Sequence, residues 1–138
     1  MPIRTDYILR LIEQCIDFVL MAAGLKRAEE VEEELVQAVS GWVGLDLELA
    51  MKMPTDSLIA LLSAGDVGAA ERLLIVGQAV AVRCLVIRKR GEAQEAVRLQ
   101  DKAAALIEAA IRIRPDYDGE KVQAVLTALY ASEPVATA

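Results

Sequence analysis

The sequence contains no histidine among its 138 residues. Histidine is the commonest general base in enzymes and the commonest metal ligand, so Ser-His-Asp triads, Cys-His pairs and histidine-based zinc sites are excluded. A phosphate-binding loop is also missing. The candidate segment Gly65-Asp66-Val67-Gly68 lacks the Lys-Ser or Lys-Thr ending that such a loop requires. We therefore expect no enzymatic activity, no metal and no cofactor.

Cysteines and aromatic residues are few. Cys15 and Cys84 both fall inside apolar helical patterns and are too few for a disulfide framework, so we expect buried free thiols. A nucleophilic role for Cys84 would require an accessible, electropositive setting, and its apolar surroundings favour a structural role instead. Aromatic residues make up 4% of the chain and hydrophobic residues 55%. A core of Ala, Val, Leu and Ile suits closely packed helices.

Apolar runs are too short to cross a membrane. The most apolar stretch, residues 73–87, is interrupted by Gln78 and Arg83, whereas a membrane span needs about 20 mostly apolar residues. The N-terminus shows no basic region followed by an apolar core, so no signal peptide is expected. We predict a cytoplasmic protein without a membrane partner.

The acidic residues are concentrated in the N-terminal half. Residues 1–69 hold 5 basic and 12 acidic residues, a net charge of −7, whereas residues 70–138 hold 10 basic and 9 acidic residues, a net charge of +1. This balance argues against a nucleic-acid partner, because a phosphate backbone binds basic surfaces. Such binding is the least favoured hypothesis, and it would depend on basic residues of the second half: Arg83, Arg88, Lys89, Arg90 and Arg98.

Apolar residues recur at spacings of three and four along most of the chain, which is typical of amphipathic helices. The pattern predicts four or five main helices and one short helix, with approximate bounds 5–24, 26–43, 55–65, 67–89, 92–114 and 119–130. Thr5 and Asp66 are expected to cap two of them, and Asp116 or Asp118 the last. Residues 45–53 alternate apolar and polar as a strand would, but no second strand exists to pair with them. We predict a connector or a short helical turn there.

The segment 67–89 is apolar on nearly all sides, which indicates a helix that is central or lies at an interface. A short turn, residues 88–92, joins it to the next helix, so the two form a hairpin. Gly77 lies in the middle of the helix, where it costs about 1 kcal/mol relative to Ala. A close helix–helix crossing would explain this glycine.

The turn and the second helix of this hairpin resemble a tetratricopeptide repeat. That repeat places a small residue before the turn, a glycine at the turn, and two alanines beyond it. Cys84, Gly91, Ala96 and Ala103 match these positions. Small residues there let the two helices approach closely. Glu108 stands where the repeat expects proline, and the match covers one repeat, whereas a binding solenoid needs about three or more.

The chain as a whole resembles a small bacterial family of all-helical domains with no assigned activity. The resemblance rests on residues 6–14 (Asp-Tyr-Ile-Leu-Arg-Leu-Ile-Glu-Gln) and residues 44–49 (Gly-Leu-Asp-Leu-Glu-Leu). Members of the family pair these motifs with a repeat-like hairpin. The resemblance implies the fold and a bacterial origin, and it assigns no functional residue. In this chain the turn after Gly24 is shorter and more acidic than in the family.

These patterns together predict one all-α domain over residues 1–138, built from antiparallel helical hairpins with tetratricopeptide-like packing. Residues 5–65 would form an N-terminal hairpin and connector, residues 66–131 the repeat-like hairpin and last helix, and residues 132–138 a tail. The run of glutamates at 29–34 would be a solvated acidic face, because consecutive helical residues point in different directions.

The leading functional hypothesis is a non-enzymatic protein-interaction or scaffold domain that self-associates as a homodimer through apolar helix faces, with another protein or a peptide as a further partner. The candidate interaction residues are Trp42, Gly77, Val80, Cys84, Arg88 and Arg90. For Trp42 a core role is favoured over a partner contact, and for Arg88 and Arg90 a helix-terminal role is favoured. The alternative is a small-ligand-binding or enzymatic helical bundle that uses an inner acidic pair, Glu13 and Asp17.

Overall fold

The computed structural model describes residues 2–21, 24–65 and 67–131, and these residues contain helices but no strand. The helices are α1 (Pro2–Leu20), α2 (Leu25–Val43), α3 (Leu47–Lys52), α4 (Thr55–Leu62), α5 (Ala69–Lys89), α6 (Ala93–Ile113), the 3₁₀ turn η1 (Pro115–Tyr117) and α7 (Glu120–Tyr130). The predicted all-α class is confirmed. In this part of the chain no helix combines the length and the apolar character that a membrane crossing requires.

The alternating segment 45–53 folds as the short helix α3, as predicted. The Asp46 side chain accepts a hydrogen bond from the Glu48 amide at 3.3 Å, which caps the helix. Leu47, Ala50 and Met51 are buried. Spacings of three and four residues therefore pack α3 on the core, whereas Leu49 of the alternating set is exposed.

Three helix starts differ from the prediction or lie outside the described residues. Helix α1 begins at Pro2 rather than at Thr5. Helix α7 begins after Gly119 without a side-chain cap, because the carboxylate of Asp118 accepts a hydrogen bond from Gln123 Nε2 at 2.6 Å instead. The expected cap Asp66 and the expected tail 132–138 lie outside the described residues.

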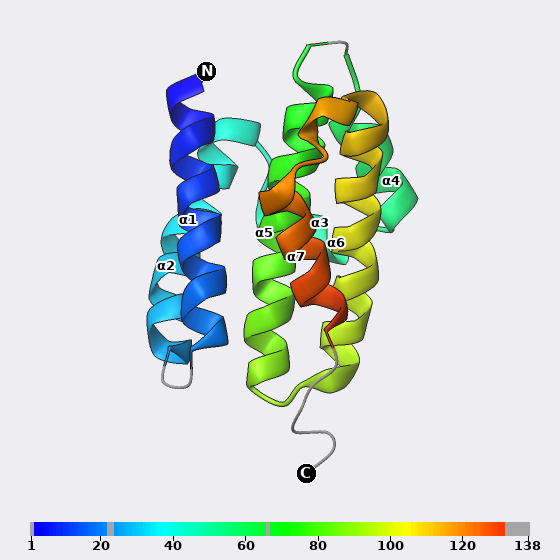
Figure 1. Ribbon diagram of the computed structural model, residues 1–138. Helices are drawn as coiled ribbons and strands as arrows, with labels where there is room; N and C mark the ends of the chain where they lie inside the picture. The colour runs from blue at the N-terminus through cyan, green and yellow to red at the C-terminus, as the bar shows by residue number, and fades with distance from the viewer. Residues whose placement is uncertain (1, 22–23, 66, 132–138) are drawn as a thin grey trace.

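Helix α5 is the centre of the fold. In Figure 1 it lies between α1 and α2 on one side and α6 on the other, with α7 in front, and it contacts all four helices. Nearly all of its residues from Ala69 to Ile87 are buried. A helix that is apolar on every side needs such a position. Its apolar surface is thus covered by the same chain, and an interface on α5 with a second copy is not available.

Gly77 marks the crossing between α5 and α6. A Cβ atom at this position would lie 2.9 Å from Ile107 Cγ1, 3.0 Å from Leu106 Cβ and 3.1 Å from the backbone nitrogen of Ile107. The close crossing predicted from the glycine is confirmed. It lies within the chain rather than between two copies, because α6 is the partner helix.

The segments on either side of the Gly91 turn form the predicted antiparallel hairpin. Gly91 has φ of +89°, a left-handed conformation that favours glycine. The Cys84 thiol donates a hydrogen bond to the Ala96 carbonyl at 3.1 Å, and Ala96 and Ala103 are buried. Small side chains therefore line the contact between α5 and α6. Tetratricopeptide-like packing of the whole chain stays a prediction.

Arg88 fastens the end of α7 to this hairpin. Its guanidinium donates hydrogen bonds to the backbone carbonyls of Ala128 at 3.2 Å and Leu129 at 2.6 Å, and to Gln100 Oε1 at 3.0 Å. Carbonyls in the last turn of a helix lack intrahelical partners and carry partial negative charge. The guanidinium supplies both the missing donors and the complementary charge.

Replacing Arg88 with methionine is expected to lower the free energy of unfolding by about 2 kcal/mol, because charged hydrogen bonds to the end of α7 are lost. Amide hydrogen exchange of the variant, compared with wild type, should be accelerated more in α7 than in α5. Lys89→Met removes the same charge one residue later, at an exposed position, and is the matched control. Equal exchange in α7 for the two variants would contradict the fastening role of Arg88.

Candidate functional site

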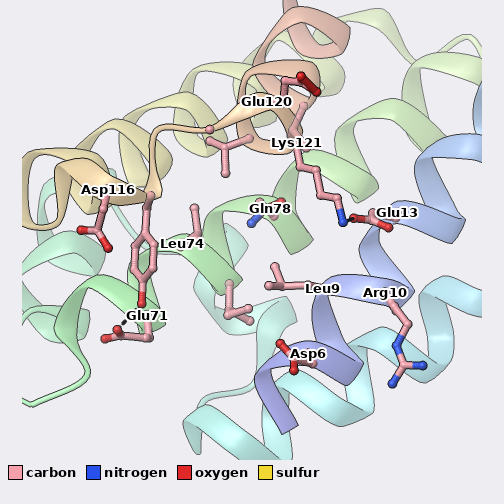
Figure 2. Close-up of a pocket in the computed structure, with 15 residues that line it drawn as sticks. Asp6, Leu9, Arg10, Glu13, Glu71, Leu74, Gln78, Asp116, Glu120 and Lys121 are labelled. Carbon is pink, nitrogen blue, oxygen red and sulfur yellow. Dashed lines mark hydrogen bonds and ion pairs between the residues drawn. The ribbon is translucent and has the colours of Figure 1, made fainter. Parts of the chain in front are cut away.

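A cavity of about 740 Å³ lies between α1, α5, η1 and α7. Its volume is within the range of about 300–1,000 Å³ that is usual for binding pockets in proteins. Figure 2 shows α1 and the segment leading into α7 on opposite sides of it, with α5 between them. The cavity is thus formed by segments that are far apart in the sequence.

The lining of the cavity is largely apolar. Helix α5 contributes Leu74 and Ile75, and the first turns of α7 contribute Val122 and Val125, all of which are buried. Leu9 of α1 completes the apolar lining. The two valines are three residues apart, so both lie on the face of α7 that is turned toward α5.

Gln78 places an uncharged amide beside the apolar side chains of this lining. Its side chain lines the cavity one turn beyond Leu74, and the residue is 3% exposed. Among the described residues, its Nε2 atom has no hydrogen-bond partner. A buried donor without an acceptor costs about 1–3 kcal/mol, and such groups are rare in native structures. The unpaired donor of Gln78 therefore suggests that the cavity holds a group that accepts a hydrogen bond.

Charged side chains surround the opening. Glu13 of α1 and Lys121 of α7 form an ion pair at 2.9 Å that joins the two walls, and Figure 2 shows this bridge beside the cavity. The remaining ionisable groups of the lining, apart from Tyr117, are Asp6, Arg10, Glu71, Asp116 and Glu120. Among the side chains that the structure describes, the opening thus has five carboxylates against two cations.

Glu71 and Tyr117 close another side of the cavity. The Tyr117 hydroxyl donates a hydrogen bond to Glu71, and Arg114 Nη1 lies 3.2 Å from the same carboxylate. The hydroxyl bond lowers the pKa of Glu71, and a backbone hydrogen bond and the Arg114 charge add to this effect. Burial, with the bond to Glu71, raises the pKa of Tyr117 to about 12. At neutral pH the tyrosine is a neutral donor and the glutamate an anion.

The residues predicted as interaction sites lie away from this cavity. Gly77, Val80 and Cys84 are buried in the core of the chain, so the prediction that they meet a partner is corrected: α1, α2, α6 and α7 already cover α5. Burial also raises the pKa of the Cys84 thiol. Low accessibility and a protonated sulfur agree with the structural role favoured from the sequence.

The other three candidates make contacts within the chain. Trp42 is partly buried against the core. Arg88 holds the end of α7, and Arg90 Nη2 lies 2.7 Å from Glu29 Oε2. The two arginines therefore stabilise the fold at the end of α5, which agrees with the helix-terminal role.

The arginines considered for nucleic-acid binding also have partners inside the chain. Arg83 binds Glu32 and Glu48, and Arg98 binds Glu95 and the Met51 carbonyl. These groups are spread over several ion pairs instead of forming one basic surface.

The glutamates of residues 29–34 point in different directions, and the prediction of a solvated acidic face is wrong for Glu32. Glu32 is buried against Arg83, whereas Glu33 and Glu34 are exposed. In the part of the chain that the structure describes, no three His, Cys, Asp or Glu side chains gather in a metal-binding arrangement. The inner acidic pair of the alternative hypothesis is not assembled at the cavity, because Glu13 lines it and Asp17 does not.

Sequence reasoning noted Gln78 only as an interruption of an apolar run. Its position on a helix that is otherwise apolar could have marked it as a candidate. Such a helix is buried, and a buried amide needs a hydrogen-bond partner. The rest of the cavity could not be found in this way, because its walls come from α1 and α7.

In comparisons with protein-family models, curated proteins and solved structures, none matches this chain. The resemblance to a small bacterial helical family and to the tetratricopeptide repeat stays a prediction.

Proposed function

We propose that the protein is a non-enzymatic interaction domain that binds a partner in the cavity between α1, α5 and α7. The observation that supports this proposal is the buried amide of Gln78, a side chain of the cavity lining whose Nε2 atom lacks an acceptor among the described residues. Because this atom is itself closed to solvent, the amide would turn toward the cavity on binding, and a bound ligand would then supply that acceptor and remove the energetic penalty. This function keeps the interaction class expected from the sequence and moves the surface from α5 to the cavity.

Self-association as a homodimer stays a second proposal. Its original basis was the apolar surface of α5, which the chain itself covers. The large apolar side chains that remain exposed are spread over several elements: Tyr7, Leu20, Met21, Leu49, Leu61, Val67, Val97, Ile113 and Tyr130. Light scattering during size-exclusion chromatography measures the mass directly, and a monomer at micromolar concentration would rule out a stable dimer. The cytoplasmic location is likewise a prediction.

Nile red, a neutral dye whose fluorescence rises in apolar surroundings, tests the cavity. The wild-type protein should bind it saturably. Leu9→Trp places a bulky ring on the α1 wall and should weaken binding by at least about tenfold. Leu20→Trp makes the same replacement on the same helix at a position that is 64% exposed, and should bind the dye as wild type does.

The far-ultraviolet circular dichroism of both variants should match wild type, which shows that the fold is kept. Binding that is equal in the two tryptophan variants, or absent from the wild-type protein, would overturn the proposed function.

A further inference from the structure

We infer that the ligand of the cavity is a short peptide segment that carries aliphatic side chains and at least one lysine or arginine. This inference rests on the proposed function and names its partner. Three features of the cavity support it: the amide of Gln78, the aliphatic lining and the excess of carboxylates at the opening.

The Gln78 amide matches a peptide group. A glutamine side chain presents an N–H donor and a carbonyl acceptor next to each other, and an extended peptide presents one N–H and one carbonyl per residue. Gln78 Nε2 lacks an acceptor among the described residues, and a backbone carbonyl supplies one. The neighbouring carbonyl oxygen of Gln78 can then accept from a backbone N–H of the same segment.

The aliphatic lining suits branched side chains. Leu9, Leu74, Ile75, Val122 and Val125 line the cavity together with Gln78, and Tyr117 is the aromatic residue among the described lining residues. Burial of aliphatic side chains against them contributes binding energy in proportion to the apolar area removed from water. An extended segment fits this combination. One of its peptide groups bonds to Gln78, and the aliphatic side chains on either side of that group pack against the lining.

The charges at the opening select a basic segment. The described lining residues include five carboxylates and two cations. Lys121 is already bound to Glu13 at 2.9 Å. Arg114, beside the cavity, lies 3.2 Å from both Glu71 and Asp116, so one cation serves two carboxylates.

Figure 2 shows the guanidinium of Arg10 directed away from Gln78. The potential at the opening is therefore negative, and it attracts a basic peptide and repels an acidic one.

Selection from a phage-displayed library of short random peptides tests this inference on the full chain. Peptides that bind wild type are counter-selected against Leu9→Trp, so that only ligands of the cavity remain. We expect enrichment of Lys, Arg and aliphatic residues and depletion of Asp and Glu. Binding of a selected peptide should weaken as salt rises, because exposed charges are screened within about 8 Å at physiological ionic strength.

Two variants probe the contacts of a selected peptide. Gln78→Leu should weaken its binding by at least about tenfold, whereas the melting temperature should stay the same or rise, because a buried group without a partner is removed. If Gln78 had only a structural role, Gln78→Leu would lower the melting temperature and leave peptide binding unchanged. Asp6→Asn should weaken binding by about threefold at low salt, and Asp17→Asn, an exposed position on the same helix, should leave it unchanged.

The outcomes separate this inference from the proposed function. Enriched apolar peptides without a basic bias, or with an acidic bias, overturn the inference and leave the proposed function intact. Nile red binding without any enriched peptide overturns the peptide as ligand and assigns the cavity to a small molecule. Absence of Nile red binding to the wild-type protein overturns the proposed function itself, and this inference with it.

Discussion

Replacing Arg83 with methionine is expected to lower the free energy of unfolding by about 2–4 kcal/mol. Arg83 on α5 donates to Glu32 of α2, and its Nη2 lies 2.8 Å from Glu48 Oε2 of α3. The Glu32 side chain is 7% exposed and that of Arg83 20%. Removing the guanidinium leaves a buried carboxylate without its partner, and an unpaired buried charge is among the costliest single defects.

The loss should depend on pH in a definite direction. Burial raises the pKa of Glu32 above its ordinary value of 4.5, and Arg83 opposes this rise. Without Arg83 the pKa rises further, so the folded variant holds a proton that the unfolded chain releases. This bound proton stabilises the folded variant fully at pH values below the pKa of Glu32 in the unfolded chain. The stabilisation is lost as the pH rises through the pKa of Glu32 in the folded variant. Urea unfolding should therefore show a small deficit near pH 4 and the full deficit at pH 7.

Two controls isolate the buried pair. Arg27→Met breaks an ion pair with Glu30 whose side chains are 71% and 57% exposed, and such pairs contribute about 0–1 kcal/mol. The double replacement Arg83→Met with Glu32→Gln should recover part of the loss, because no buried charge remains. If Arg83→Met were no less stable than Arg27→Met, the buried pair would not contribute as described.

Replacing Gly77 with leucine should be at least as damaging, with a loss of about 3 kcal/mol, the upper end of the usual cost of overpacking. A Cβ atom alone would meet Ile107 and Leu106 at 2.9–3.1 Å. One of these contacts is to a backbone nitrogen, which cannot turn away as a side chain can. Helices α5 and α6 would have to separate along the main contact of the fold.

The melting temperature of Gly77→Leu measures this loss, with an expected decrease of about 10 °C. Gly41→Leu is the matched control, because it lies in α2 and a Cβ atom there meets nothing within 4 Å. That variant should keep or raise the stability, since leucine favours helix more than glycine by about 1 kcal/mol. Equal melting temperatures for the two variants would contradict the close crossing at Gly77.

Local patterns predicted most of the helices and the hairpin of α5 and α6. The small residues Cys84, Ala96 and Ala103 around Gly91 predicted a close contact between the two helices. Both helices belong to one hairpin, so they face each other whatever the rest of the chain does. The alternating segment 45–53 was correctly predicted not to be a strand, since a single strand has no partner. The start of α7 was predicted to within one residue, but the predicted cap was wrong, because Gly119 is the N-cap and the Asp118 carboxylate binds Gln123.

The candidate interaction residues show what sequence patterns leave open. Gly77, Val80 and Cys84 were selected because they lie on an apolar helix, and that property marks the core and an interface alike. Arg88 and Arg90 were selected for their charge, and their partners Leu129 and Glu29 are about 40 to 60 positions away in the chain. Sequence spacing does not disclose which distant group will meet them.

The sequence by itself determined the helical class, the hairpin and the lack of histidine chemistry, because composition and periodicity are properties of short segments. Only the tertiary structure decided that α5 is covered by its own chain and that Gln78 borders a cavity. Both depend on which helices lie beside α5, and that choice is made by packing between residues far apart in the chain.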